Sequence, residues 1–393
     1  MTEPESGALV ARSPNSSHRF RALDSLRGIA ACTVVLGHFC NLAPLIFLRR
    51  TPVRLLLGGH EAVILFFVLS GFVLTVQITS RTKVNYLSFA AQRVTRIYIP
   101  YFCAFAIGLT CYLSADAHPA PWAGPWFNGA WQSPLPKDVI SGHLALILPF
   151  DTSSLVPVFW TLVYEMRVSL VLPLCVYAAQ RMSALSSLAV GLLLSCLCYA
   201  LISFQQVTQL TSENLRADWT PTLHYTGIFF VGIALALHRD AATAFIRKHA
   251  KPALVLAVGI VLFYSGSPTG FVMHDLLGDF TYDWLVAAGA GLIVAATISG
   301  ESISRALRHP VLTFLGDISY SLYLLHTLVL LTVVHLAGQE FPKSVTILAA
   351  LALTVPIAYL SYRFIEVPTI RLGRKLAEKI RAWNGPAVSL DIR

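Results

Sequence analysis

The sequence predicts an all-α, polytopic integral membrane protein with about ten transmembrane helices and both termini in the cytoplasm. Hydrophobic residues make up 55% of the 393-residue chain and charged residues only 12%, whereas a soluble domain carries roughly 25% charged residues. The apolar residues also recur in blocks near the ~20-residue length that crosses a bilayer as a helix. Together these observations exclude a water-soluble protein.

Ten apolar blocks are candidates for crossing the membrane, although the seventh and eighth are short. We expect residues 1–22 to form a polar cytoplasmic tail, residues 23–371 a single transmembrane domain, and residues 372–393 a basic cytoplasmic tail. The ten blocks cover about residues 27–47, 60–79, 97–115, 157–179, 185–204, 220–238, 252–267, 284–299, 315–336 and 344–365.

The basic residues set the direction of these spans. With the N-terminus inside, 21 Lys and Arg residues fall in cytoplasmic segments and 6 in external ones, which is the asymmetry that the positive-inside rule describes. The net charge of +9 therefore faces membrane lipids rather than nucleic acid. The long external loop, residues 116–156, carries Trp122, Trp126 and Trp131, and we expect it to lie on the membrane surface.

The seven cysteines all lie in apolar stretches. None of them forms a CxxC motif with neighbouring His or acidic residues, so we expect buried thiols and no metal site.

Ionisable residues inside the spans point to function, because each costs several kcal/mol to place in the membrane. Arg27 and His38 are eleven residues apart on the first span, so they share a helix face and lie about 16 Å apart in depth. In the fourth span, Glu165 belongs to a polar stripe with Thr161 and Ser169 at four-residue spacing. We expect Glu165 near the depth of His38.

In the ninth span, Ser319, Tyr323 and His326 share one face. His326 should also lie near the depth of His38 and Glu165. Three titratable groups at one depth favour a buried chamber, although a lone His in a span can equally be a hydrogen-bonded core residue.

Arginines near the membrane boundary allow two interpretations. Arg93 and Arg96 lie one turn apart where the third span begins, so they are either topology anchors or a bidentate site for phosphate on a cytosolic ligand. Arg363 is expected to pair locally with Glu366, and Arg167 is expected either to form an ion pair with another helix or to snorkel.

The motifs resemble those of the acyltransferase 3 family of integral-membrane acyltransferases, from about Phe20 to Arg371. The resemblance rests on LDSLRGIAACTVVLGH with Arg27 and His38, ILFFVLSGFVL at 64–74, Arg93-x-x-Arg96, FWTLVYE ending at Glu165, SYSLYLLH ending at His326, and FIEVP. No one of these motifs is decisive, but six in the right order make the resemblance strong.

This resemblance implies an acyl donor from the cytosol, usually acetyl-CoA, as substrate and not as a permanently bound cofactor. It implies His38 as the catalytic residue, with Arg27, Arg93 and Arg96 serving the donor. The acceptor would be a hydroxyl of a cell-surface or exported glycan or lipid-linked saccharide, at the inner membrane of a bacterial cell. Some relatives carry an extracytoplasmic domain that completes transfer, so the resemblance implies either that the membrane domain acts alone or that a separate external acceptor protein receives the acyl group.

The residues suit that chemistry, because acyl transfer from a thioester to a hydroxyl needs a base and a stabiliser of the carbonyl oxygen. His38 would be the base, oriented by Glu165 or His326, and Tyr323 would stabilise the oxyanion. An acyl-histidine relay is the other route. Two rival functions remain: a proton-coupled secondary transporter that uses His38, Glu165 and His326 as a relay, and a non-catalytic component of polysaccharide export.

Overall fold

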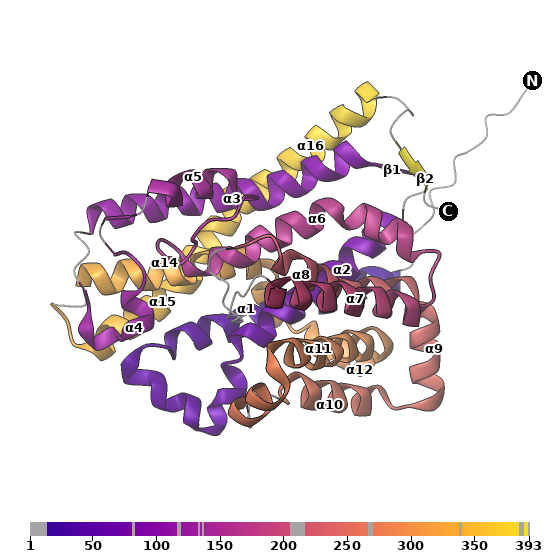
Figure 1. Cartoon of the computed structure of the whole chain (residues 1–393), viewed down its shortest axis with the longest axis horizontal. Helices are drawn as coiled ribbons and strands as arrows, with labels where there is room; N and C mark the ends of the chain where they lie inside the picture. Colours follow the sequence, from indigo (N-terminus) through magenta and orange to yellow (C-terminus); the bar gives the residue numbers. More distant parts are fainter. Residues whose placement is uncertain are drawn as a thin grey trace, which may run out of the picture.

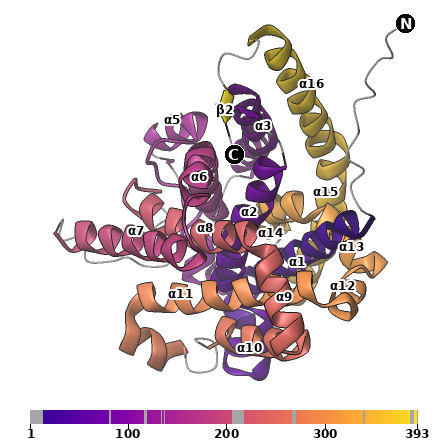
Figure 2. The same cartoon turned by 90° about the vertical axis from the view of Figure 1, so that its right-hand side faces the viewer.

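The structure is a computed structural model that describes residues 14–80, 83–115, 119–132, 134–135, 137–204, 217–265, 270–337, 340–384 and 389–391. These residues form a bundle of helices (Figures 1 and 2), accompanied by one antiparallel pair of short strands, β1 (Lys83–Asn85) and β2 (Ser389–Asp391). The predicted all-α, polytopic class is confirmed.

Ten long helices build the bundle. They are α1 (Pro14–Phe39), α2 (Gly59–Thr79), α3 (Tyr86–Ser114), α6 (Trp160–Ala179), α7 (Ala184–Phe204), α8 (Pro221–Leu237), α11 (Gly270–Ser299), α14 (Ser319–Ala337), α15 (Lys343–Ser361) and α16 (Val367–Asn384). Short helices connect them: η1 (Ala43–Arg50), η2 (Pro52–Leu56), η3 (Pro121–Ala123), α4 (Pro125–Asn128), α5 (Lys137–Ala145), η4 (Pro157–Phe159), α9 (Arg239–His249), α10 (Pro252–Phe263), α12 (Glu301–Leu307), α13 (Pro310–Asp317) and η5 (Tyr362–Glu366).

Seven helical segments of the described chain are long and apolar enough to cross a membrane alone, and two bent pairs raise the number to nine. The helix α10 is apolar but only 12 residues long, about 18 Å against a hydrocarbon core of about 30 Å. Each of the ten predicted blocks thus contains an apolar helix, although the last two residues of the seventh block lie outside the described residues. The short α9 turns by 73° from α8 and crosses one end of the bundle (Figure 1).

The first helix differs from its predicted span. It begins at Pro14, inside the predicted tail, whose first 13 residues lie outside the described residues. It ends at Phe39, where the chain bends by 120° into η1. Pro44 follows closely and cannot continue a helix. His38 therefore lies in the last turn of α1, where the chain changes direction, and not in the middle of a straight span.

The third helix begins eleven residues before its predicted start because its polar first half packs against another helix. The Asn85 side chain accepts a hydrogen bond from the Ser88 backbone at 2.9 Å and caps α3. The Ser88 hydroxyl donates to the Ala377 carbonyl of α16 at 3.0 Å. The segment predicted as a basic tail is therefore helical up to Asn384 and lies along α3 (Figure 1).

The helix α2 lies at the centre of the bundle and contacts α1, α6, α8 and α11. Its closest neighbour is α8, where Gly71 and Gly232 let the two backbones touch: a Cβ on Gly71 would overlap the Phe229 carbonyl, and one on Gly232 would overlap the Val68 carbonyl. Close backbone approach of this kind is a common way to pack helices in a membrane. This packing fixes the position of α2, part of which lines the candidate site.

The long loop after α3 is folded into the protein, so its predicted place on the membrane surface is wrong for Trp131. That side chain is only 2% exposed, and its indole N–H donates to the Leu155 carbonyl at 3.0 Å. Its ring stacks on His335 with 5.0 Å between centroids. A buried hydrogen-bonding partner for the indole N–H outweighs the preference of tryptophan for the interface.

Candidate active site

His38 and His326 form a directly bonded pair between α1 and α14. His38 Nδ1 lies 2.9 Å from His326 Nε2, and the two ring centroids are 5.0 Å apart. His326 is fully buried and His38 is half-buried. The structure thus brings together two of the residues singled out in the sequence.

The hydrogen positions of this pair follow from its surroundings. His326 Nδ1 contacts only carbonyl oxygens, those of Tyr323 at 2.7 Å and Leu322 at 3.2 Å, so Nδ1 must carry a hydrogen and donate it. In a neutral ring Nε2 is then the acceptor, and His38 Nδ1 donates to it. The lone pair of His38 therefore lies on Nε2, which is the arrangement that a base requires.

A tryptophan from the long loop covers one face of His38. The Trp126 ring stacks on the imidazole with 5.2 Å between centroids and 23° between planes. Its helix, α4, is fixed by Asn128, whose side chain bonds both backbone groups of Ala120 and the carbonyl of Gly124. Trp126 thus orients the His38 ring, a role that the sequence did not reveal.

Tyr323 links the histidine pair to a cavity. Its ring meets that of His326 edge-on, with 5.9 Å between centroids. The Thr161 hydroxyl donates to the Val158 carbonyl at 3.1 Å and can accept from the Tyr323 hydroxyl at 2.8 Å. The predicted polar stripe of α6 therefore meets α14 at this point.

The cavity has a volume of about 480 Å³. Five of the seven predicted site residues line it, while His38 and His326 lie beyond Tyr323. Its lining residues are Asp24, Arg27, Val63, Phe66, Phe67, Ser70, Val73, Leu74, Gln77, Arg93, Arg96, Ile97, Thr161, Leu162, Glu165, Gly316, Asp317, Ser319, Tyr320, Tyr323, Tyr362, Glu366, Ile370 and Arg374.

Glu165 is the partner of an arginine and not of His38. Its Oε1 lies 3.2 Å from Arg93 Nη2, which also donates to the Ser169 hydroxyl at 3.3 Å. His38 bonds His326 and stacks on Trp126, so of the two residues expected to orient His38, His326 is in place and Glu165 is not. A continuous relay through all three titratable groups is not formed either.

The other arginines of the cavity divide into paired and unpaired groups. Arg27 bonds Asp24 at 3.2 Å, as the three-residue spacing suggests. Arg93 is buried and pairs with the half-buried Glu165, whereas Arg96 and Arg374 are exposed and make no ion pair within the described residues. Of the predicted Arg93–Arg96 pair, only Arg96 is thus available to an anionic ligand.

Arg374 is a cavity residue that the sequence analysis missed. It belongs to a stripe with Tyr362, Glu366 and Ile370, all at four-residue spacing on one face of the α15–α16 helix. That spacing was a visible signal, but Arg374 fell within residues 372–393, which were predicted to be a tail. A Cβ on the adjacent Gly373 would overlap the Thr95 hydroxyl, so α16 lies directly against α3 beside Arg96.

Two other predicted contacts have different outcomes. Glu366 accepts from the Ser321 hydroxyl at 2.8 Å, and no ion pair with Arg363 occurs in the described part of the chain, so that predicted pair is wrong. Arg167 binds other segments, as expected, but through backbone carbonyls of Ile147, Ala217 and Asp218.

Comparison with known proteins gives one family. A family model described as an acyltransferase domain, Acyl_transf_3, matches residues 20–363. The chain is 22% identical to the O-acetyltransferase PaAT-1 of Phomopsis amygdali, over 91% of this chain and 84% of the relative. It is 28% identical to the exopolysaccharide production protein ExoZ of Rhizobium meliloti, over 80% of this chain and 91% of the relative.

A further relative, nodulation protein 10 of Rhizobium leguminosarum bv. viciae, is 25% identical over 93% of this chain and 97% of its own length. No solved structure matches the chain. The family match covers most of the sequence and includes every predicted site residue. The chain therefore belongs to the acyltransferase 3 family and is a multi-pass membrane acyltransferase.

Proposed function

We propose that this acyltransferase moves an acetyl group from cytosolic acetyl-CoA to a hydroxyl of a cell-surface or exported glycan, in the inner membrane of a bacterial cell. The names of two relatives, an O-acetyltransferase and an exopolysaccharide production protein, support the acyl group and the acceptor class. The surplus of basic residues in the segments expected inside supports cytoplasmic termini and a donor that enters from that side.

The observation that carries the proposal is the bonded histidine pair. Because His326 Nδ1 donates to backbone carbonyls, the pair leaves the lone pair of His38 on Nε2. In the direct route His38 Nε2 takes the hydroxyl proton while the acceptor oxygen attacks the thioester carbonyl. The new C–O bond replaces the C–S bond, and the proton passes from His38 to the departing sulfur, which leaves as the CoA thiol.

The alternative route begins with His38 Nε2 itself as the nucleophile. The nitrogen attacks the thioester and CoA leaves as the thiolate, so the acetyl group is carried on the imidazole. A hydroxyl oxygen then attacks this acetyl group, the C–N bond breaks to release the neutral ring, and the hydroxyl proton passes to the thiolate to give the CoA thiol. Both routes need the same neutral ring and the same free nitrogen. Both also allow a separate external protein to receive the acetyl group.

The two ends of the cavity differ in chemistry, and this difference supports one orientation of the donor. Tyr323 and Thr161 lie at the end nearest the histidines, whereas Arg96 of α3 and Arg374 of α16 are exposed and make no ion pair among the described residues. We place the thioester at the first end and the phosphates at the second, because guanidinium groups bind phosphate through paired hydrogen bonds. Tyr323 would turn its hydroxyl hydrogen from Thr161 to the carbonyl oxygen as negative charge develops.

A radiolabel assay tests this function. Purified protein in lipid is given acetyl-CoA labelled in the acetyl group, with and without exported polysaccharide from candidate bacterial strains, and both CoA thiol and labelled polysaccharide are measured. We expect thiol release and label transfer to rise together when the acceptor is present. Thioester that stays intact with every acceptor, while the protein remains folded, would contradict the proposal.

A further inference from the structure

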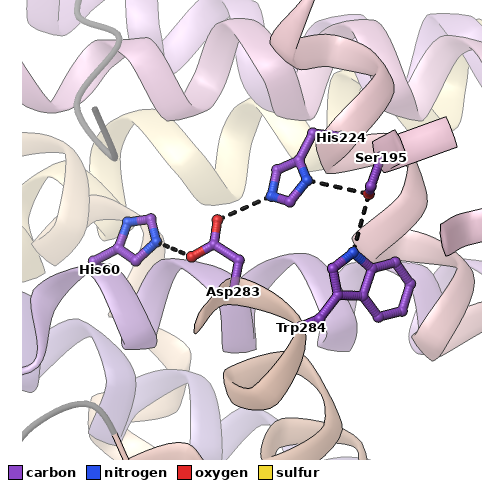
Figure 3. Close-up of polar contacts among 5 residues, drawn as sticks. All are labelled: His60, Ser195, His224, Asp283 and Trp284. Carbon is purple, nitrogen blue, oxygen red and sulfur yellow. Dashed lines mark hydrogen bonds and ion pairs between the residues drawn. The ribbon is translucent and has the colours of Figure 1, made fainter. Parts of the chain in front are cut away.

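A second buried polar cluster lies outside the cavity and joins four helices (Figure 3). Asp283 of α11 is 5% exposed and bonds two histidines, His60 in the first turn of α2 and His224 in the first turn of α8. The distance from His224 Nε2 to Asp283 Oδ2 is 2.9 Å. On its other side, His224 Nδ1 lies 3.1 Å from the hydroxyl of Ser195 in α7, which Trp284 also contacts at 3.1 Å.

The chemistry of these groups fixes which atom donates and which accepts in each hydrogen bond of the cluster. The Trp284 indole can only donate, so Ser195 accepts from it and donates its own hydrogen to His224 Nδ1. With neutral rings, His224 Nε2 then donates to Asp283, and His60 Nε2 donates to the other carboxylate oxygen. Asp283 is thus the common acceptor on which two helix ends are fixed.

The order serine, histidine, aspartate is also that of an activated nucleophile. Here the surroundings exclude that role, because Ser195 is fully buried under α8. A Cβ on Gly227 would lie 2.7 Å from the Ser195 oxygen and would overlap the Gly191 carbonyl, so the space above the hydroxyl is already filled by backbone. An acyl carbon has no room beside it, and the cluster holds helices together.

One of those helix ends lies directly against the candidate base. A Cβ on Gly37, the residue before His38, would lie 2.9 Å from the Leu57 carbonyl. A Cβ on Gly59, the residue before His60, would lie 4.0 Å from Val34 Cα. The last turn of α1 and the first turn of α2 therefore touch through their backbones, with His38 and His60 each one residue from the contact.

We propose that His60 and Asp283 are positioning residues for the acyl transfer: by fixing the first turn of α2 to α11, they set the place of the last turn of α1 and with it His38. This inference rests on the proposed function. A displacement of about 1 Å at a reacting group can cost up to about 100-fold in rate, so loss of the clamp should lower turnover without touching the donor cavity.

The first test separates positioning from general stability. His60→Leu removes the bond to Asp283, whereas His60→Gln keeps an N–H near the position of Nε2. Ser195→Ala is the matched control, because it breaks the same cluster at the end far from α2. We expect His60→Leu to lower kcat about tenfold or more with an unchanged KM for acetyl-CoA, His60→Gln to recover most of it, and Ser195→Ala to keep kcat. Wild-type kcat in His60→Leu, or an equal loss in Ser195→Ala, would overturn the inference.

The second test needs no enzymatic activity and so separates this inference from the proposed function. Cysteines placed at Val34 and Gly59, in a chain without the native cysteines, lie within reach of a disulfide. We expect oxidative cross-linking to be fast with His60 or with His60→Gln and at least fivefold slower with His60→Leu. Equal cross-linking rates would show that the clamp does not fix this contact, whether or not the protein transfers acetyl groups.

Discussion

Arg374 offers the sharpest test of the donor cavity, because a matched control lies on the same helix. Arg374→Ala removes one guanidinium from the lining of the cavity, and Arg371→Ala removes one from an exposed position that is not part of the lining. Both changes alter the net charge equally. Any difference between them therefore reports direct contact with the donor and not the general field of the basic helix.

The expected size follows from the exposure of Arg374. A hydrogen bond to a charged group contributes about 1.5–3 kcal/mol when it is shielded from water, and a partly solvated pair contributes less. We therefore use about 1.4 kcal/mol, which is a tenfold change in affinity. KM for acetyl-CoA should rise about tenfold in Arg374→Ala and less than twofold in Arg371→Ala.

The assay compares acetyl-CoA with acetyl-pantetheine, which carries the same thioester but no phosphate. The tenfold effect of Arg374→Ala should disappear with the shorter donor. Repeating the measurement in neutral detergent and in vesicles with anionic lipid shows whether lipid phosphate competes for the same arginine. An equal KM change for both donors, or for both arginine variants, would refute the assignment of the phosphates to this end of the cavity.

Three further predictions concern topology, pH and packing. In a chain without native cysteines, Gln132→Cys should react with a membrane-impermeant reagent on intact cells and Lys375→Cys only after permeabilisation; the reverse pattern would invert the proposed orientation. Burial lowers the pKa of His143, in the loop helix α5, to about 3, whereas an unfolded histidine titrates near 6.5. The unfolded chain therefore binds more protons between these pH values, and the free energy of unfolding should fall as pH drops from about 6.5 towards 3, by at most about 1.4 kcal/mol per pH unit. In thermal melts, His143→Phe should lose this part of the pH dependence of stability. An identical pH dependence in the wild type and the variant would count against this role of His143. Gly232→Ala should lower the melting temperature strongly because the new methyl group meets the backbone of α2, while Gly129→Ala, whose nearest atom lies 3.4 Å away, should leave it nearly unchanged; similar melting temperatures would contradict the close α2–α8 contact.

The sequence predicted where the membrane helices lie better than where they begin and end. Hydropathy finds the parts of helices that face lipid or core, so all ten apolar blocks fall on helices. It cannot find a polar half-helix that is stabilised by another helix, which is why the starts of α3 and α16 were missed. The contact between Ser88 and Ala377 that joins them is formed by residues far apart in the chain.

The site could be predicted as a set of residues but not as a set of contacts. Helical spacing placed Arg27, His38, Tyr323 and His326 correctly in one region, since spacing fixes which residues share a face. It could not choose among partners from different helices. Glu165 and His326 were therefore alternatives for orienting His38, and in the structure His326 bonds His38 while Glu165 pairs with Arg93 on α3.

The Asp283 cluster was missed because of its position at the ends of the predicted spans. His60 was the first residue of one predicted block, and Asp283 preceded another by one residue. Both therefore lay at predicted membrane boundaries, where polar and charged residues are common and do not by themselves indicate a site. In the structure α11 begins at Gly270, and Asp283 lies well within the helix. The predicted start at residue 284 was thus fourteen residues after the true start at Gly270, and this error hid a buried carboxylate.

The rate of acetyl transfer by His38→Gln shows whether His38 takes part in the reaction. Glutamine keeps a hydrogen-bonding side chain beside His326 and Trp126 but cannot take the hydroxyl proton or carry the acetyl group. We predict a protein that melts near the wild-type temperature and transfers acetyl groups about 10²–10⁴ times more slowly. Transfer at a rate close to wild type by this folded variant would contradict the role of His38 in either route, and with it the account of the site.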